Sequence, residues 1–122
     1  MTARTCTALG AFLAGLGVML GAFGAHTIRD TIPADRMAVY QTGSHYHLLH
    51  AIALFALGLG FEKVGKGSRI AAWLFTAGIV VFAGSLYALA LTGIRVFGAI
   101  TPIGGVCFIS GWLVLGYFSL KA

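Results

Sequence analysis

Apolar residues dominate the chain in four long runs, and charged residues gather between these runs. The first run, residues 5–25, lies between Arg4 and His26 and contains no charge. A helix that crosses a bilayer needs about 20 predominantly apolar residues. By this measure the pattern predicts four spans, which cover residues 5–26, 45–61, 70–92 and 100–120.

The spans predict an all-α fold with a single membrane domain over residues 1–122. Backbone polar groups in lipid must be satisfied within the protein, so four antiparallel helices in one integral membrane four-helix bundle form the simplest architecture. The connection over residues 31–43 is predicted to hold a short interfacial helix after the first span. Pro33 suits a first helical turn and Asp35 favours its positive end. An ordinary solvated loop is the alternative.

A cleaved signal peptide is the competing interpretation of residues 1–25. Arg4 resembles a basic leader region, and small residues near Gly24 offer a cleavage site. The apolar run is longer than the usual leader run of about 7–15 residues, which favours a first span.

Composition supports a membrane protein. Apolar residues make up 59% of the chain and charged residues 9%, with a mean hydropathy of +0.95. The net charge of +5 is scattered between apolar segments rather than collected in one basic patch. Because nucleic acids require such a patch, the partners we expect are the lipid bilayer and another membrane protein or further copies of the chain, not a nucleic acid.

Charge also predicts an orientation. Five Lys and Arg residues fall on one side of the four spans: Arg4, Lys63, Lys66, Arg69 and Lys121. Three fall on the other: Arg29, Arg36 and Arg95. Since Lys and Arg are in excess in cytoplasmic loops, both termini are predicted to be cytoplasmic in a multi-pass protein of the bacterial inner (plasma) membrane.

Small residues at helical spacing predict where the helices touch. In the first span they lie along one stripe: Gly10, Ala14, Gly17, Gly21 and Gly24. Membrane helices associate by close packing at such stripes. Gly84 in the third span, with Gly104 and Gly111 in the fourth, are the predicted groove for the first helix. Packing within one bundle is favoured over packing between subunits.

The topology gathers polar side chains at the non-cytoplasmic end of the bundle. The candidate pocket contains His26, Tyr46, His50, Ser85, Tyr87, Arg95 and Thr101. Ionisable groups near hydrocarbon usually face the bundle interior or water. Arg95 is either a headgroup anchor or a site for an anionic lipid or substrate.

The histidines His45, His47 and His50 do not form one ligand set. At about 100° per residue, His47 and His50 share a helix face, whereas His45 is roughly 160° from His47. We predict no metal site and no cofactor. The alternative is a haem or metal held by His26 and His50. The favoured interpretation makes His26 and His50 structural hydrogen-bonding groups, with His45 and His47 in the headgroup region.

Motifs for catalysis are missing from the sequence. It has no Gly-rich phosphate loop, nucleophile elbow or paired carboxylates, and no Asp or Glu lies inside a span. We therefore predict a non-enzymatic structural, assembly or accessory component. The alternatives are a small transporter, channel or lipid-binding protein that uses the polar pocket, and a His-ligated haem or metal protein.

Three segments carry a resemblance to a known family: "GAFGAH" (21–26), "YQTGSHYHLLHAIAL" (40–54) and "FAGSLYALALTGIRVFGAITPIGGVCFISGW" (82–112). Together they resemble the membrane proteins of domain of unknown function 423, which include the transmembrane protein 256 group. The resemblance implies a small four-span protein without an assigned activity. It also adds Gln41 to the candidate pocket, and it does not require histidine at positions 45 and 47.

Overall fold

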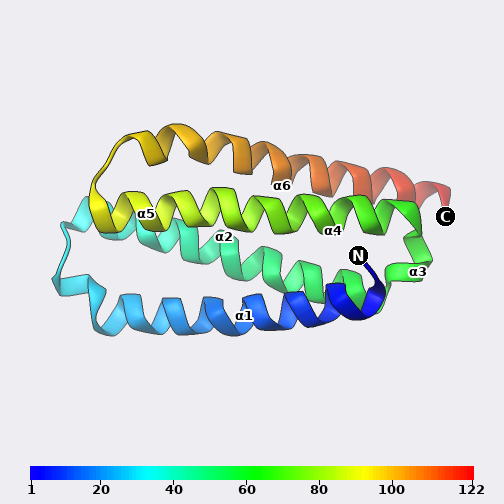
Figure 1. The fold of residues 1–122 in the computed structure, drawn as a ribbon, viewed down its shortest axis with the longest axis horizontal. Helices are drawn as coiled ribbons and strands as arrows, with labels where there is room; N and C mark the ends of the chain where they lie inside the picture. The colour runs from blue at the N-terminus through cyan, green and yellow to red at the C-terminus, as the bar shows by residue number, and fades with distance from the viewer.

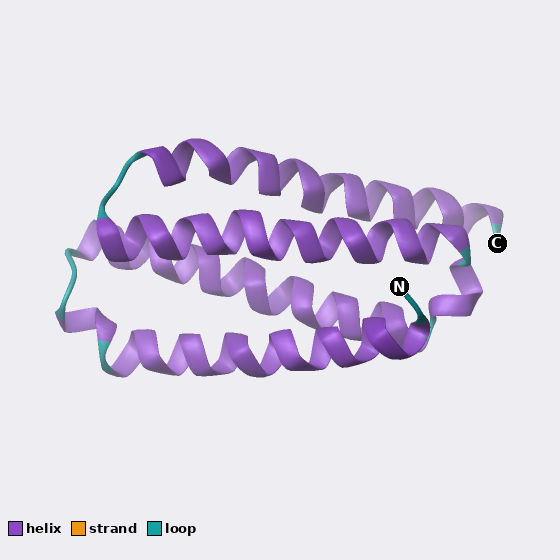
Figure 2. Ribbon diagram, viewed as in Figure 1, coloured by secondary structure: helices purple, strands orange, loops and turns teal.

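The computed structural model describes residues 1–122 and contains helices without any strand (Figures 1 and 2). The prediction of an all-α fold is confirmed. The long elements are α1 (Ala3–His26), α2 (Ala34–Leu59), α4 (Lys66–Gly78), the π-helix η2 (Ile79–Ala83), α5 (Gly84–Thr92) and α6 (Val96–Lys121). Two short elements, η1 (Ile28–Asp30) and α3 (Phe61–Val64), lie in the connections.

Three helices are long and apolar enough to cross a membrane. They are α1, the continuous helix Lys66–Thr92 formed by α4, η2 and α5, and α6. We call the second of these the α4–α5 helix. Helix α2 is of similar length but is not among them. Its most apolar 18 residues, 42–59, include three histidines, which lower the mean hydropathy.

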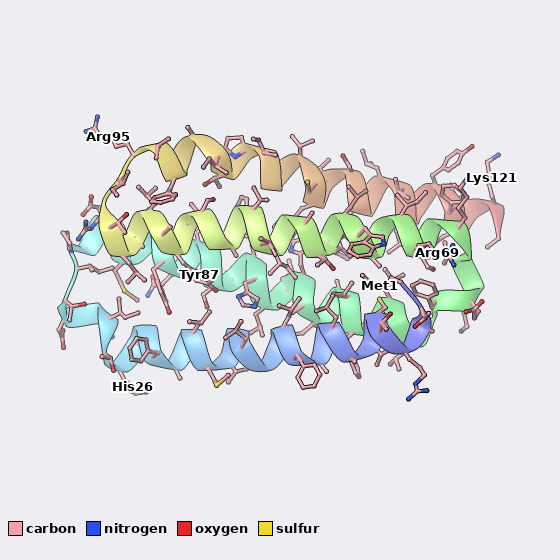
Figure 3. The ribbon with its side chains drawn as sticks, viewed as in Figure 1. Met1, His26, Arg69, Tyr87, Arg95 and Lys121 are labelled. Atoms are coloured by element: carbon pink, nitrogen blue, oxygen red, sulfur yellow. The ribbon has the colours of Figure 1, made fainter.

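The long helices lie side by side, and helices that follow one another in the chain are neighbours in space (Figure 1). Helix α1 packs chiefly on α2, α2 also packs on the α4–α5 helix, and α6 packs chiefly on the α4–α5 helix. The short connections explain this order, because consecutive helices joined by few residues fold back on one another. Met1, Arg69 and Lys121 lie at one end of the molecule, and His26 and Arg95 lie at the other (Figure 3).

The glycine stripe of α1 faces α2. Gly10 lies against the backbone of Ala51 and Phe55, and Gly24 lies against the ring of Tyr40. Gly17 and Gly21 occupy the positions between them, beside His47 and Ser44. Because glycine has no Cβ, the two helix backbones approach closely along the whole stripe.

The prediction that Gly84, Gly104 and Gly111 form the groove for α1 is wrong. Gly104 and Gly111 do not meet α1, because they receive Phe82 and Phe75 of the α4–α5 helix. Gly84 is exposed and has no neighbouring heavy atom where a Cβ would stand, so it takes no part in helix packing. Spacing along one helix predicted a close approach but did not identify the partner helix.

The predicted interfacial helix over residues 31–43 is also corrected. Residues 34–43 are the first turns of α2, which begins after Pro33 and continues without a break to Leu59. Met37, Tyr40 and Gly43 are buried and belong to the same stripe as the buried residues further along α2. Since this stripe packs continuously and contains no second proline, the helix has no reason to end before the span.

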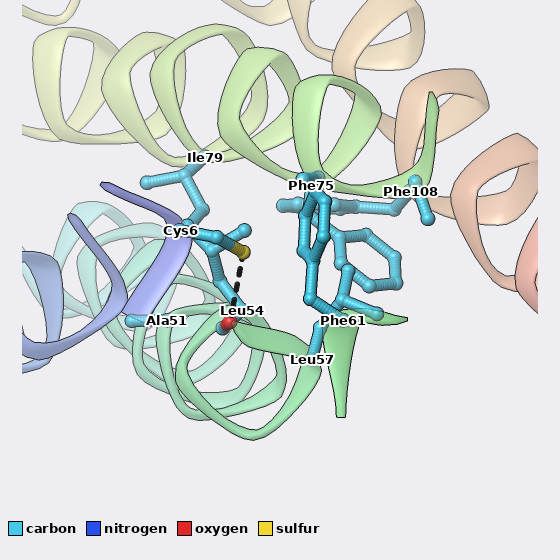
Figure 4. Close-up of a cluster of buried hydrophobic side chains, with 10 residues drawn as sticks. Cys6, Ala51, Leu54, Leu57, Phe61, Phe75, Ile79 and Phe108 are labelled. Carbon is cyan, nitrogen blue, oxygen red and sulfur yellow. Dashed lines mark hydrogen bonds between the residues drawn. The ribbon is translucent and has the colours of Figure 1, made fainter. Parts of the chain in front are cut away.

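The main core lies at the end of the bundle that holds both chain termini (Figure 4). Phe75 and Phe108 pack there with Leu54 and with Cys6, whose thiol donates a hydrogen bond to the Leu54 carbonyl over 3.3 Å. Cys6 is a fully buried core residue, and a buried free thiol packs like a small apolar side chain.

Candidate functional site

Two histidines of α2 are buried in the middle of the helix assembly. His47 and His50 each expose only 2% of their surface. They belong to the buried stripe of α2, which advances in steps of three and four residues through Tyr40, Gly43, His47, His50, Leu54 and Leu57. Polar groups buried among apolar side chains must find hydrogen-bond partners, so their contacts define the candidate site.

His47 joins three helices. Its Nε2 lies 2.8 Å from the carbonyl oxygen of Leu13 in α1, and its Nδ1 lies 2.8 Å from the hydroxyl of Tyr87 in α5. A carbonyl oxygen only accepts, so Nε2 carries the proton of the neutral ring. Nδ1 therefore accepts the hydrogen bond that the Tyr87 hydroxyl donates.

His50 joins α2 to α6 with the opposite tautomer. Its Nδ1 lies 2.8 Å from the backbone carbonyl of Tyr46 and must donate. Its Nε2 accepts from the indole Nε1–H of Trp112 over 3.0 Å. The ring is also stacked on Phe108, with a centroid distance of 3.6 Å and an interplanar angle of 11°.

The two rings differ in whether a second proton would find a hydrogen-bond acceptor. A second proton on His50 would point at the Trp112 N–H, and indole has no acceptor to offer. At His47 the phenol of Tyr87 can turn to accept from a protonated Nδ1. His50 is thus fixed as a neutral ring for as long as α6 stays in place, and neither ring has a free lone pair for a metal or haem iron.

Two further polar contacts hold the same assembly. The Ser85 and Thr101 hydroxyls lie 2.6 Å apart between α5 and α6. The Tyr40 hydroxyl donates to the Leu20 carbonyl of α1 over 2.5 Å. Both of these contacts cross between helices, so these hydroxyl groups help to hold the helices of the chain together.

The structure does not bring the predicted pocket residues together. Tyr87, Ser85, Thr101 and His50 are engaged in separate contacts inside the assembly, as described above. His26, Gln41, Tyr46 and Arg95 are all exposed. Tyr46 does contact His50, as a stacked ring with a centroid distance of 6.2 Å rather than through its hydroxyl. The single polar pocket is therefore corrected to several distinct contacts.

His26 and His50 are far apart along the bundle. His47 is bonded to Leu13, which precedes His26 by about 20 Å of helix at about 1.5 Å per residue. His50 lies almost one further turn away, because α2 runs antiparallel to α1. The two rings cannot ligate one iron, and no group of three or more His, Cys, Asp or Glu residues is placed to hold a metal ion.

The sequence interpretation missed His47 and Trp112. His47 was placed in the headgroup region, yet it is one of the most buried side chains. Its spacing from Gly43 and His50 was the available signal, because these positions share one helix face. Trp112 offered another signal, since an indole N–H within a span needs an acceptor.

Open hollows lie at the helix ends and on the outer face of α2. One of about 360 Å³ is lined by Arg29, Ala34, Met37, Ala38 and Gln41. A shallower one of about 220 Å³ is lined by His45, Leu48, Leu49 and Ile52. The inward-facing rings of His47 and His50 line neither of them.

The family model and the relatives that match this chain point to the same family. The family described as "Protein of unknown function (DUF423)" matches residues 20–105. The chain is 48% identical over 115 residues to the UPF0382 membrane protein YwdK of Bacillus subtilis, covering 93% of this chain and 94% of the relative. It is 36% identical over 129 residues to the UPF0382 inner membrane protein YgdD of Escherichia coli K12, covering 99% of this chain and 95% of the relative. No solved structure matches the chain.

Proposed function

Because the chain belongs to the DUF423 family, whose matched relatives are membrane proteins without an assigned activity, we propose that it is a structural, assembly or accessory component of the bacterial inner membrane with no catalytic activity of its own. One observation carries this proposal. All four ring nitrogens of the buried His47 and His50 are hydrogen-bonded within the chain. Such groups stabilise a helix assembly, and neither buried ring keeps a nitrogen free for chemistry.

The proposal includes four membrane spans. Helix α2 lies antiparallel along almost the full length of α1, from the Tyr40 contact with Gly24 to the Gly58 contact with Thr7. It also connects α1 to the α4–α5 helix, and both of these helices are apolar enough to cross. A helix packed between two crossing helices has to cross with them. Its less apolar face is sheltered by its neighbours.

Charge supports the proposed orientation. Figure 3 places Met1, Arg69 and Lys121 at one end of the bundle and Arg95 at the other. The end with the termini also carries Lys63 and Lys66, and positive residues are in excess on the cytoplasmic side. Both termini are therefore assigned to the cytoplasm.

Cysteine labelling tests the crossing of α2. In a Cys6→Ala, Cys107→Ala background, Asp35→Cys and Glu62→Cys place one thiol just inside α2 and one just beyond it, and both positions are exposed. We expect a membrane-impermeant maleimide to label residue 35 in intact spheroplasts and residue 62 only after permeabilisation. Thr2→Cys serves as the matched cytoplasmic control. Equal labelling of residues 35 and 62 in intact spheroplasts would show that α2 does not cross.

Mild extraction tests the functional proposal. Protein produced at native level and extracted with digitonin is expected to migrate in a complex with a larger membrane protein and to carry no small ligand in native mass spectrometry. Gly10→Leu, which should disrupt the packing of α1 on α2, is the control that ought to lose the complex. A solitary chain with its own bound metabolite, haem or metal would instead support the pocket or cofactor functions.

A further inference from the structure

A line of exposed residues runs along the whole free face of α2. Its members advance in alternating steps of four and three: Ala38, Thr42, His45, Leu49, Ile52, Ala56 and Leu59. This spacing is the 3.5-residue repeat of a helix that pairs with another helix along its length. We call this line the α2 seam. Neither α1 nor the α4–α5 helix covers it.

The part of the seam near the start of α2 is polar although it lies within the span. Ser44 lies opposite Gly21. His45 is one residue deeper, about 9 Å inside the end of α1 at about 1.5 Å per residue. Gln41 lies beside the seam, one turn nearer that end. The side-chain hydrogen bonds of α2 are made by other residues, namely Tyr40, Thr42, His47 and His50. Gln41 and His45 therefore present donors and acceptors that the chain itself does not satisfy.

Lipid is a poor partner for His45, the deeper of these two side chains. Acyl chains offer no hydrogen bonds, and polar residues within membrane spans characteristically bond across helix interfaces. The seam also has small residues, Ala38 and Thr42, beside the larger His45, and small residues let a second helix approach closely. Next to them lies the hollow of about 220 Å³ that Leu48, Leu49 and Ile52 line with His45. A protruding side chain of a second helix would fit such a hollow.

We propose that the α2 seam binds a second copy of this chain, with α2 against α2 around a two-fold axis along the membrane normal. Two copies inserted in the same orientation bring each seam residue to the depth of its own counterpart. His45 then meets His45 of the second copy, and Gln41, beside the seam, flanks this contact. A neutral imidazole carries one donor and one acceptor, so the His45 pair is self-complementary. The proposal rests on the structural role inferred above and on the crossing of α2.

Disulfide cross-linking in native membranes tests the contact. In the Cys6→Ala, Cys107→Ala background, Ala38→Cys, Thr42→Cys and Leu49→Cys are oxidised with copper phenanthroline. A disulfide requires Cα atoms about 4.4–6.8 Å apart, which seam residues near a two-fold axis satisfy. We expect dimers at these positions. Val80→Cys and Ile109→Cys are matched exposed controls on the α4–α5 helix and on α6, and they should remain monomeric.

A second measurement separates a specific contact from chance collisions. Full-length protein with single fluorescent labels is reconstituted into phosphatidylethanolamine and phosphatidylglycerol vesicles, and dimer fraction is followed by energy transfer as the protein-to-lipid ratio falls. The double substitution Gln41→Leu, His45→Leu is expected to weaken dimerisation roughly tenfold, since interhelical hydrogen bonds in membranes are worth up to about 1.7 kcal/mol. Ile109→Leu should leave it unchanged.

Five results would overturn the proposal. The first four are a monomer at every protein-to-lipid ratio, cross-linking at Ile109 rather than at the seam, seam cross-links to a different protein, and a dimer that is indifferent to loss of Gln41 and His45. The fifth is retention of a phosphatidylglycerol molecule at Arg29 and Gln41 in place of a second copy. These failures are distinct from failure of the structural role, because a ligand-loaded or catalytically active chain would refute that role whether or not it dimerises.

Discussion

Replacing Gly10 with leucine is expected to drive α1 away from α2 and to destabilise the protein more than any other single change considered. A Cβ at position 10 would stand 2.7 Å from the Phe55 Cα and 3.0 Å from the Ala51 carbonyl oxygen. Both obstacles are backbone atoms of α2, which cannot turn aside as a side chain can. Overpacking costs about 1–3 kcal/mol and occasionally more, and we expect Gly10→Leu to lie at or above the top of that range.

The free energy of unfolding in mixed micelles, measured by SDS titration, checks this expectation. Gly15→Leu is the matched control, because it makes the same change on the same helix where no heavy atom lies within 4 Å of the added Cβ. Gly17→Ala should be intermediate, since its added Cβ would meet the Leu48 side chain at 3.2 Å. Equal loss of stability at positions 10 and 15 would mean that the α1 stripe does not pack on α2.

Replacing His50 with leucine is expected to cost about 2–4 kcal/mol, in line with breaking a buried polar contact. The substitution removes the acceptor of the Trp112 N–H and the aromatic stack on Phe108. The indole N–H is then left without a partner between α2 and α6. Trp112→Phe alone should cost less, because it leaves only the His50 Nε2 lone pair unpaired.

A double-mutant cycle separates the hydrogen bond from packing. His50→Leu with Trp112→Phe removes both partners, so the pair should lose less stability than the sum of the single changes. Trp73→Phe is the control for the indole, because Trp73 is 58% exposed and is the other tryptophan of the chain. Strict additivity within the measurement error would contradict a direct bond between His50 and Trp112.

The elements that hydropathy defines were the most predictable part of the molecule. Long charge-free runs bounded by Arg, Lys and Gly predicted helices close to where α1, α4–α5 and α6 lie. Helix α2 was harder to predict, because the polar residues Asp35, Arg36 and Gln41 are typical of a surface segment. Its first turns are held in the helix by Met37 and Tyr40, whose burial depends on neighbouring helices that local sequence does not reveal.

The candidate site was less predictable, because it depends on contacts between distant residues. The bond from Trp112 to His50 joins positions 62 residues apart, and the bond from His47 to Tyr87 joins positions 40 apart. Both histidines lie on one stripe of α2, and this was visible in their spacing. Their depth in the membrane could not be predicted from spacing, because it follows from the register of α1 against α2 at Gly10 and Gly24.

Nitrogen-15 NMR of the imidazole rings tests most directly whether His47 and His50 fasten the helices as neutral groups. Protein with labelled histidine in bicelles, with His26→Ala and His45→Ala to remove the exposed rings, leaves only the two buried signals. We expect two opposite neutral tautomers at pH 7, with the proton on Nε2 of His47 and on Nδ1 of His50. A cationic ring, a metal-shifted nitrogen, or the same tautomer at both positions would contradict the structural role of this pair.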